Sequence, residues 1–144
     1  MSPEQAKAQV NRMLDEVINQ NHPERIKDYF APDYVERATA PGVPPTREGV
    51  IQTVTMLRAA FPDFRYTVDD TLCDGDLVAS RVTGHGTMMG TLQGMPATGK
   101  HASWPELHVV RLNQDGKIVE HWGNVDQLGM MAQLGLAPAP GAAQ

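Results

Sequence analysis

The sequence predicts an α+β fold in which N-terminal helices cover one face of a curved antiparallel sheet and close it into a cone with an interior pocket. Helical spacing of apolar residues is confined largely to the first sixty or so positions, apart from a short segment near the C-terminus. The rest of the chain alternates apolar and polar residues in runs separated by turn signals, among them Asp74-Gly75 and Asp115-Gly116. Helices and strands that are segregated along the chain indicate α+β rather than α/β. A cone closed in this way offers a mostly apolar site for a small molecule.

Composition limits the function classes. With 144 residues the chain is long enough for one domain that buries roughly 68–70% of its unfolded surface, and we assign it residues 1–136. The formal charge of −5, with basic residues scattered, argues against a nucleic-acid or anionic-membrane surface. The single cysteine permits no internal disulfide, and the sequence has no long apolar run or signal peptide, so we expect a cytoplasmic protein. Residues 137–144, rich in Ala and Pro, are expected to be a disordered tail.

Two long helices and a short one are expected in the N-terminal half. Ser2-Pro3-Glu4-Gln5 carries a helix cap, a proline at the first helical position and a capping-box glutamine, and predicts a helix to about residue 20. A short helix follows Pro23, a turn is expected at residues 31–33 and a short strand at residues 34–39. Thr46 is the expected cap of the second long helix, whose apolar stripe ends at Phe61.

The remaining residues are predicted to form the sheet. Strands are expected at residues 64–68, 77–86, 100–112 and 117–124, with a turn-rich crossing at residues 94–99. Asp126 then stands where it could cap a last short helix.

The hairpin of residues 103–126 concentrates the residues that carry chemistry. If its loop is residues 113–116, Leu112 lies opposite Lys117 and His108 lies opposite His121. One face of the hairpin then holds Trp104, Glu106, His108, Val110, Val119, His121 and Gly123. A three-residue loop would instead bring Glu120 and Trp122 to that face, so the site depends on the register.

Glu106 and His108 are the first candidates for catalysis. They stand two residues apart on one strand, so they share a face, and the carboxylate can set the tautomer of the imidazole. Such a pair can donate to a carbonyl or transfer a proton near neutral pH, which contributes about 10²–10⁴-fold to a rate. Two other interpretations stay open: His108 as a satisfied core histidine, and a metal site made with His121. We expect no metal or other cofactor.

Four stretches, taken together, resemble one family. They are P-P-T-R-E-G, L-R-A-A-F-P-D-F-R, G-M-P-A-T-G-K and D-G-K-I-V-E-H-W with a downstream aspartate, and they span roughly residues 30–135. In this order they resemble the SnoaL-like polyketide cyclases, which share the cone fold of ketosteroid isomerase and NTF2. The resemblance implies an enzyme of polyketide antibiotic biosynthesis that encloses a linear polyketide and closes a carbon ring. In the best-known members this is an intramolecular aldol reaction without metal or cofactor.

The resemblance also implies roles for single residues. His108 matches a strand histidine that helps to bind the developing enolate. The family's acid/base aspartate often follows His-Trp directly, but that position is Gly123 here, and the next acid is Asp126. Ketosteroid isomerases carry their base where this chain has Arg37 or Ala38, which speaks against their double-bond isomerisation. The missing aspartate leaves open ring closure by substrate folding, including a [4+2]-like pericyclic reaction.

These considerations give the following candidate residues. The catalytic candidates are His108, Glu106, His121 and Asp126. The substrate-binding candidates are Tyr34, Arg37, Trp104, Met88, Met89, His85 and His101. We expect a polyketide substrate and a homodimer formed through the outer sheet face, where Leu107, Val109 and Trp122 lie. The alternatives are a non-catalytic binding module of the same fold and an epoxide-opening or isomerase activity.

Overall fold

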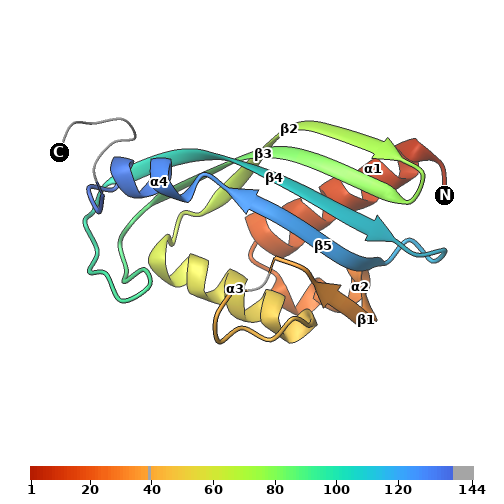
Figure 1. Cartoon of the computed structure of the whole chain (residues 1–144), viewed down its shortest axis with the longest axis horizontal. Helices are drawn as coiled ribbons and strands as arrows, with labels where there is room; N and C mark the ends of the chain where they lie inside the picture. Colours follow the sequence, from red (N-terminus) through yellow and green to blue (C-terminus); the bar gives the residue numbers. More distant parts are fainter. Residues whose placement is uncertain (39, 138–144) are drawn as a thin grey trace.

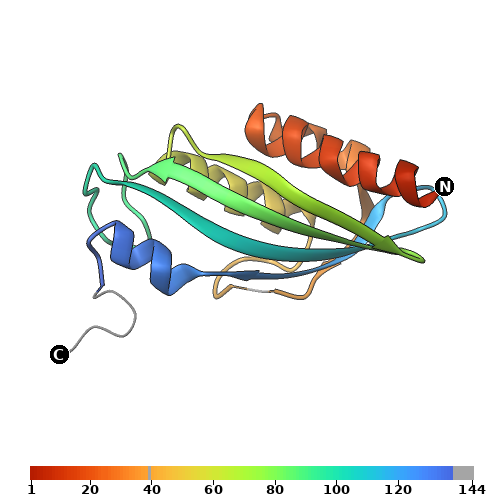
Figure 2. The same ribbon diagram turned by 90° about the horizontal axis from the view of Figure 1, so that it is seen from above.

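The computed structural model, which describes residues 1–38 and 40–137, confirms the α+β cone. A curved five-stranded sheet carries helices on its concave face, and a last short helix lies at one end (Figures 1 and 2). The strands are β1 Phe30–Glu36, β2 Arg65–Asp74, β3 Leu77–Thr87, β4 His101–Leu112 and β5 Ile118–Val125. Their order across the sheet is β1-β5-β4-β3-β2. The sheet is mixed rather than purely antiparallel, because β1 pairs with β5 in parallel.

Helices form close to where the sequence places them. In α1 (Pro3–Met13), Gln5 N–H donates to Ser2 Oγ at 3.1 Å and Ser2 N–H donates to Gln5 Oε1 at 2.8 Å, which is the expected capping box. The helix continues as a π-helical stretch, Leu14–Asn19. The other helices are α2 (Ile26–Tyr29), which follows the 3₁₀ turn Pro23–Arg25, α3 (Arg47–Ala60) and α4 (Gln127–Gln133).

The first strand differs from the prediction. The expected turn at residues 31–33 is wrong, because β1 already begins at Phe30 and runs through Pro32. Since β1 is an edge strand, a proline that cannot donate to the ladder is tolerated there. The strand was predicted to extend to residue 39 but ends at Glu36. Thr39 itself lies outside the described residues.

The predicted register of the β4–β5 hairpin is wrong by two residues, but the predicted face is right for His108, His121 and Gly123. Beyond a bulge, the buried Ile118 takes the place predicted for Val119. Leu112 lies opposite Ile118 rather than Lys117, and a bulge follows, so His108 lies opposite Gly123 while His121 lies opposite Val110. Asn113 Oδ1 accepts the N–H groups of residues 115 and 117, which stabilises the longer loop. Because side chains alternate with period two, a shift of two leaves His108 and His121 on one face.

The aromatic core lies beside the end of α3. The Trp104 indole packs against Phe61, with ring centroids 5.5 Å apart, and against Phe64 at 6.1 Å. Gly84 lies opposite Trp104 across the ladder, and a Cβ there would come within 2.7 Å of the indole. The missing side chain at residue 84 therefore makes room for the indole on the inner face.

Two expectations concern membrane-spanning segments and the C-terminal end of the chain. No helix in the described part of the chain is long and apolar enough to cross a membrane. The disordered tail expected at residues 137–144 lies, beyond residue 137, outside the described residues.

Candidate active site

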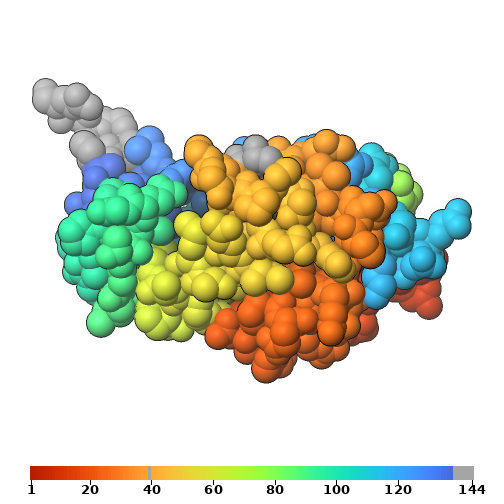
Figure 3. Space-filling model, turned by 90° about the horizontal axis from the view of Figure 1, so that it is seen from below, coloured from red at the N-terminus to blue at the C-terminus, as the bar shows by residue number. Residues whose placement is uncertain are grey.

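The cone encloses a cavity of about 640 Å³ between the concave face of the sheet and helices α1 and α3. Figure 3 shows the side of the molecule on which α3 and the segment before it cover the sheet. Apolar side chains of the helices line one side of the cavity: Val10, Met13, Leu14, Val17, Val50, Val54 and Leu57. Polar side chains line its sheet side: Tyr34, Glu36, Tyr66, Ser80, Glu106, His108 and His121. A few polar groups in an apolar cavity of this size are typical of small-molecule sites.

Glu106 is the deepest charged group of the cavity, with 4% of its surface exposed. Its Oε1 accepts from the Tyr66 hydroxyl at 2.7 Å and lies 2.7 Å from His108 Nε2. Its Oε2 accepts from Trp104 Nε1–H at 2.7 Å. A buried carboxylate is tolerated only with such donors, and the alternation of residues 104, 106 and 108 along β4 supplies two of them.

Tyr66 is held in place by a side chain from the π-helical stretch. The Asn19 side-chain amide donates to the Tyr66 carbonyl at 3.0 Å and accepts the Tyr66 N–H at 2.7 Å. Burial raises the pKa of the Tyr66 hydroxyl well above its ordinary value, and the neighbouring Glu106 charge raises it further. Tyr66 therefore stays a hydrogen-bond donor to Glu106 at any physiological pH.

The two imidazoles contact each other directly. His108 Nδ1 lies 2.8 Å from His121 Nε2, and the rings are nearly parallel, with centroids 5.0 Å apart. This contact depends on Gly123, because a Cβ there would come within 2.8 Å of His108 Nδ1. The glycine at the position of the family aspartate thus leaves space for the imidazole pair.

Glu36 completes the series at the other end. The parallel pairing of β1 with β5 sets Glu36 beside His121, and Glu36 Oε2 lies 2.5 Å from His121 Nδ1. The same carboxylate accepts from the Tyr34 hydroxyl at 3.0 Å and from Ala38 N–H at 3.1 Å. Burial alone would raise the pKa of Glu36, but the hydrogen bond and charge of His121, with the other two donors, outweigh it and lower the pKa below its ordinary value.

Counting protons defines the state of this relay, by which we mean Glu106, His108, His121 and Glu36. Its three internal hydrogen bonds each need one proton, and ionised carboxylates can only accept. The two imidazoles must then hold three protons between them, one of which they share. With both carboxylates ionised, the relay would combine one neutral imidazole with one imidazolium, for a net charge of −1.

The structure gathers some of the predicted site residues and separates others. Glu106, His108, His121, Trp104 and Tyr34 all line the cavity. Asp126 instead is exposed and caps α4, where it accepts the Gly129 N–H at 3.0 Å. The remaining candidates, Arg37, Met88, Met89, His85 and His101, are not among the described residues that line the cavity.

Each of those remaining candidates has another environment. Arg37 pairs with Glu120 at 2.9 Å. Met88 is fully buried and Met89 is exposed. His85 lies 2.9 Å from both Thr67 Oγ1 and Ser103 Oγ, and burial lowers its pKa, with the charge of Arg65 adding to the effect. His101, which is exposed, lies 3.0 Å from Thr87 Oγ1.

Glu36 and Tyr66 are the site residues that sequence reasoning missed. A weak signal existed, because Glu36 alternates with Tyr34 and Tyr66 alternates with Phe64, so each could have been placed on an inner face. Their partners depend on the pairing of β1 with β5 and on the curvature that brings β2 over β4, which no local pattern reveals.

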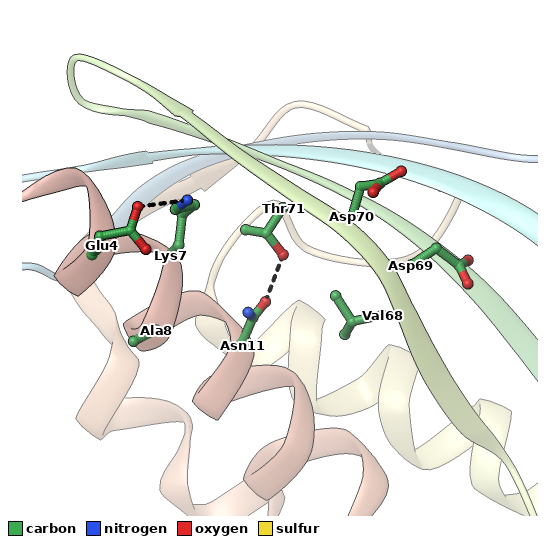
Figure 4. Close-up of a pocket in the computed structure, with 8 residues that line it drawn as sticks. All are labelled: Glu4, Lys7, Ala8, Asn11, Val68, Asp69, Asp70 and Thr71. Atoms are coloured by element: carbon green, nitrogen blue, oxygen red, sulfur yellow. Dashed lines mark hydrogen bonds and ion pairs between the residues drawn. The ribbon is translucent and has the colours of Figure 1, made fainter.

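A second hollow lies outside the cone. It runs between α1 and β2, where Lys7 pairs with Glu4 at 2.8 Å and Thr71 donates to Asn11 Oδ1 at 2.9 Å (Figure 4). Its lining includes Asp69 and Asp70, and these residues have no part in the relay.

The relay does not form a metal site. Both ring nitrogens of His108 are engaged, one with Glu106 and one with His121. Within residues 1–38 and 40–137, no group of three or more His, Cys, Asp or Glu side chains has the arrangement to hold a metal ion.

An apolar cavity inside a cone of this kind, with a hydrogen-bonded series of carboxylates and imidazoles on its wall, is suited to binding and converting a small molecule. The family described as "SnoaL-like polyketide cyclase" matches residues 8–134, and the chain belongs to this family. It is a polyketide cyclase.

Individual relatives agree with this assignment. Aklanonic acid methyl ester cyclase DnrD of Streptomyces peucetius is 30% identical over 129 residues, which cover 88% of each chain. Nogalonic acid methyl ester cyclase of Streptomyces nogalater is 29% identical over 82% of this chain and 89% of its own length. The crystal structure of IdmH from Streptomyces antibioticus superposes with a TM-score of 0.80, at 34% identity, over 91% of this chain and 99% of IdmH.

Replacing Glu36→Gln should lower the free energy of unfolding at pH 7 by about 1–3 kcal/mol, because it removes the charge that faces His121. The pKa of Glu36 is lowered in the folded protein, so its contribution is complete above the unfolded value of about 4.3. The contribution disappears as the pH falls through the folded pKa. Urea unfolding of both proteins between pH 7 and pH 3 should therefore show a difference that shrinks on acidification. The exposed variant Glu24→Gln is the control, and a difference independent of pH would contradict this role of Glu36.

Proposed function

We propose that this polyketide cyclase closes a carbon ring by an aldol-type reaction in which the imidazole pair of His108 and His121 transfers the protons. The observation that supports this proposal is the unbroken series of hydrogen bonds from Glu106 to Glu36 along the cavity wall. One ring of the pair can act as base while the other acts as acid, 2.8 Å away. General acid–base catalysis needs a proton acceptor and a proton donor positioned within hydrogen-bond reach of the reacting groups.

The reaction balances without an oxidant or a co-reactant. A carbon between two carbonyl groups of the substrate gives its proton to the neutral imidazole, and the resulting enolate carbon attacks a carbonyl carbon of the same molecule. The new carbon–carbon bond leaves an alkoxide, which takes a proton from the imidazolium. The relay ends with the same three protons, and the product is an isomer of the substrate.

The two carboxylates set the roles of the rings. Glu106 accepts from His108 Nε2–H and Glu36 accepts from His121 Nδ1–H, so the nitrogens that remain for the substrate are His108 Nδ1 and His121 Nε2. On substrate binding the rings exchange their mutual hydrogen bond for bonds to the substrate. The carboxylates also stabilise the imidazolium, which is needed in an otherwise apolar cavity.

The cavity contributes by holding a flexible chain in a reactive conformation. Positioning of this kind can supply about 7–11 kcal/mol of the barrier in favourable cases. The methyl esters of aklanonic acid and nogalonic acid, after which two of the relatives are named, are the substrates to test first. Ring closure by folding alone, including a pericyclic reaction, would use the same cavity without the relay.

A second copy of the chain is the proposed partner of the outer sheet face. Leu107 is 60% exposed and Trp122 is 36% exposed, and they flank Val109, which pairs with Trp122 across the ladder. Arg111 lies over the Trp122 ring at 5.9 Å. Contiguous apolar side chains on a sheet face are better covered than solvated, and a two-fold dimer covers both copies at once.

Replacing His108→Gln should lower kcat about 10²–10⁴-fold with little change in KM, because the substitution removes proton transfer and leaves the cavity. Aklanonic acid methyl ester is the substrate, and the isomeric product is followed by chromatography and mass spectrometry. His121→Gln should have a similar effect, and the double variant should lose little more. The exposed variant His22→Gln is the control. Unchanged turnover by His108→Gln would contradict the acid/base mechanism and would favour closure by folding alone.

Replacing Trp122→Glu should convert the dimer to a monomer. A carboxylate on the outer sheet face cannot be buried against a second copy unless an opposite charge faces it. Sedimentation or light scattering at micromolar concentration measures this. Met56→Glu, at an exposed position of α3, is the control and should leave the dimer intact. A parent protein that is already monomeric would contradict the proposed dimer.

A further inference from the structure

Ser80 is the unexplained polar residue of the cavity. Apart from tyrosine and tryptophan, Ser80 and Glu106 are the buried residues with polar side chains among those described, with 3% and 4% of their surface exposed. Ser80 lines the cavity from β3, between the buried valines 78 and 82 of the same face. Its place in this apolar row is not required for the strand to form, since a valine would fit a strand better.

The two buried polar groups differ in their partners. Glu106 is surrounded by three hydrogen-bonding groups. The Ser80 hydroxyl makes no hydrogen bond to another described residue, although the neighbouring Thr71 hydroxyl on β2 bonds to Asn11. Because Ser80 lines the cavity and its hydroxyl is not among the buried groups that lack a partner, the hydroxyl is accessible from the cavity and free to bond to a molecule held there.

The location of Ser80 gives that partner a role. Ser80 lies directly opposite His108 in the β3–β4 ladder, and opposite side chains in such a ladder have Cβ atoms about 4.5–5.5 Å apart. A substrate atom bound to Ser80 is therefore a near neighbour of the imidazole pair. The other groups at this end, Tyr66 and Trp104, already donate to Glu106.

We propose that Ser80 donates a hydrogen bond to a carbonyl oxygen of the polyketide and thereby fixes which carbon faces His108. Ser80 is a binding and positioning residue, and this role rests on the proposed function of the cavity. The substrate class follows from the chemistry of the cavity. It is a mostly apolar molecule with a carbonyl oxygen, and this oxygen is separated from the reacting carbon by about the distance between opposite side chains in the ladder.

The test compares two uncharged probes with the same ring frame, 2-hydroxymethylanthraquinone and 2-hydroxymethylanthracene. Only the first has ring carbonyl groups. Binding to the whole protein is measured by quenching of tryptophan fluorescence, since Trp104 lines the cavity. Ser80→Ala should weaken binding of the quinone about 3- to 10-fold, the range for one neutral hydrogen bond, and leave binding of the anthracene unchanged. Thr83→Val is the control: it removes a hydroxyl of the same strand that bonds to Asp69 instead of facing the cavity.

Thermal unfolding without a probe is the second measurement. Ser80→Ala should leave the melting temperature unchanged or raise it, because the hydroxyl has no partner to lose. A marked fall would show a structural hydrogen bond and overturn the proposal. Equal affinity of the parent protein and Ser80→Ala for the quinone would also overturn the proposal. This result would not bear on the aldol mechanism, which the His108→Gln variant tests separately. Failure of the parent to bind either probe would count against the cavity as a polyketide site, and so against both proposals.

Discussion

The structure depends on keeping the negative charge of Glu106 inside an apolar cone. A carboxylate in such surroundings is stable only when donors surround it, and here they come from Tyr66 on β2 and from Trp104 and His108 on β4. The hydrogen bonding continues along the cavity wall: His108 is paired with His121, and His121 is paired with Glu36. Four of the five strands thus contribute to one hydrogen-bonded series, which couples the curvature of the sheet to the charge state of the site.

The relay also reconciles two demands that an aldol reaction makes on one small space. The site must take a proton from carbon and give one to oxygen, and yet it must be apolar enough to hold a polyketide. In the proposed mechanism, two imidazoles that share a proton would meet both demands, with one as the base and the other as the acid before the substrate arrives. Gly123 is part of this arrangement, because a side chain at that position would occupy the space of the rings. In the proposed mechanism, the relay takes the acid/base role of the aspartate that the family resemblance would place at residue 123.

Sequence reasoning could predict the cone, the caps at Ser2 and Asp126 and the inner face of the hairpin because these follow from local patterns. Thr46 stands at the predicted N-terminus of α3, but its side chain makes no capping hydrogen bond. The pairing of Glu106 with His108 follows from their spacing of two on one strand. The register of the hairpin could not be predicted, because the turn signal does not reveal the residues added by the bulge and by the Asn113 loop. His108 and His121 still share a face only because the register shift is an even number of residues. Glu36 could not be assigned a partner, because β1 and β5 are more than eighty residues apart and pair in parallel. The capping position of Asp126 was predicted from the sequence and is confirmed, whereas its absence from the cavity lining depends on the path of the chain after β5 and could not be predicted locally.

The central claim is that His108 and His121 share one proton at neutral pH, and NMR of the protein with ¹⁵N-labelled histidine tests it most directly. The account predicts one strongly downfield imidazole proton that couples to both His108 Nδ1 and His121 Nε2. It also predicts that the other nitrogen of each ring carries a proton. Two neutral rings whose facing nitrogens both lack a proton, or two rings that titrate independently, would contradict it.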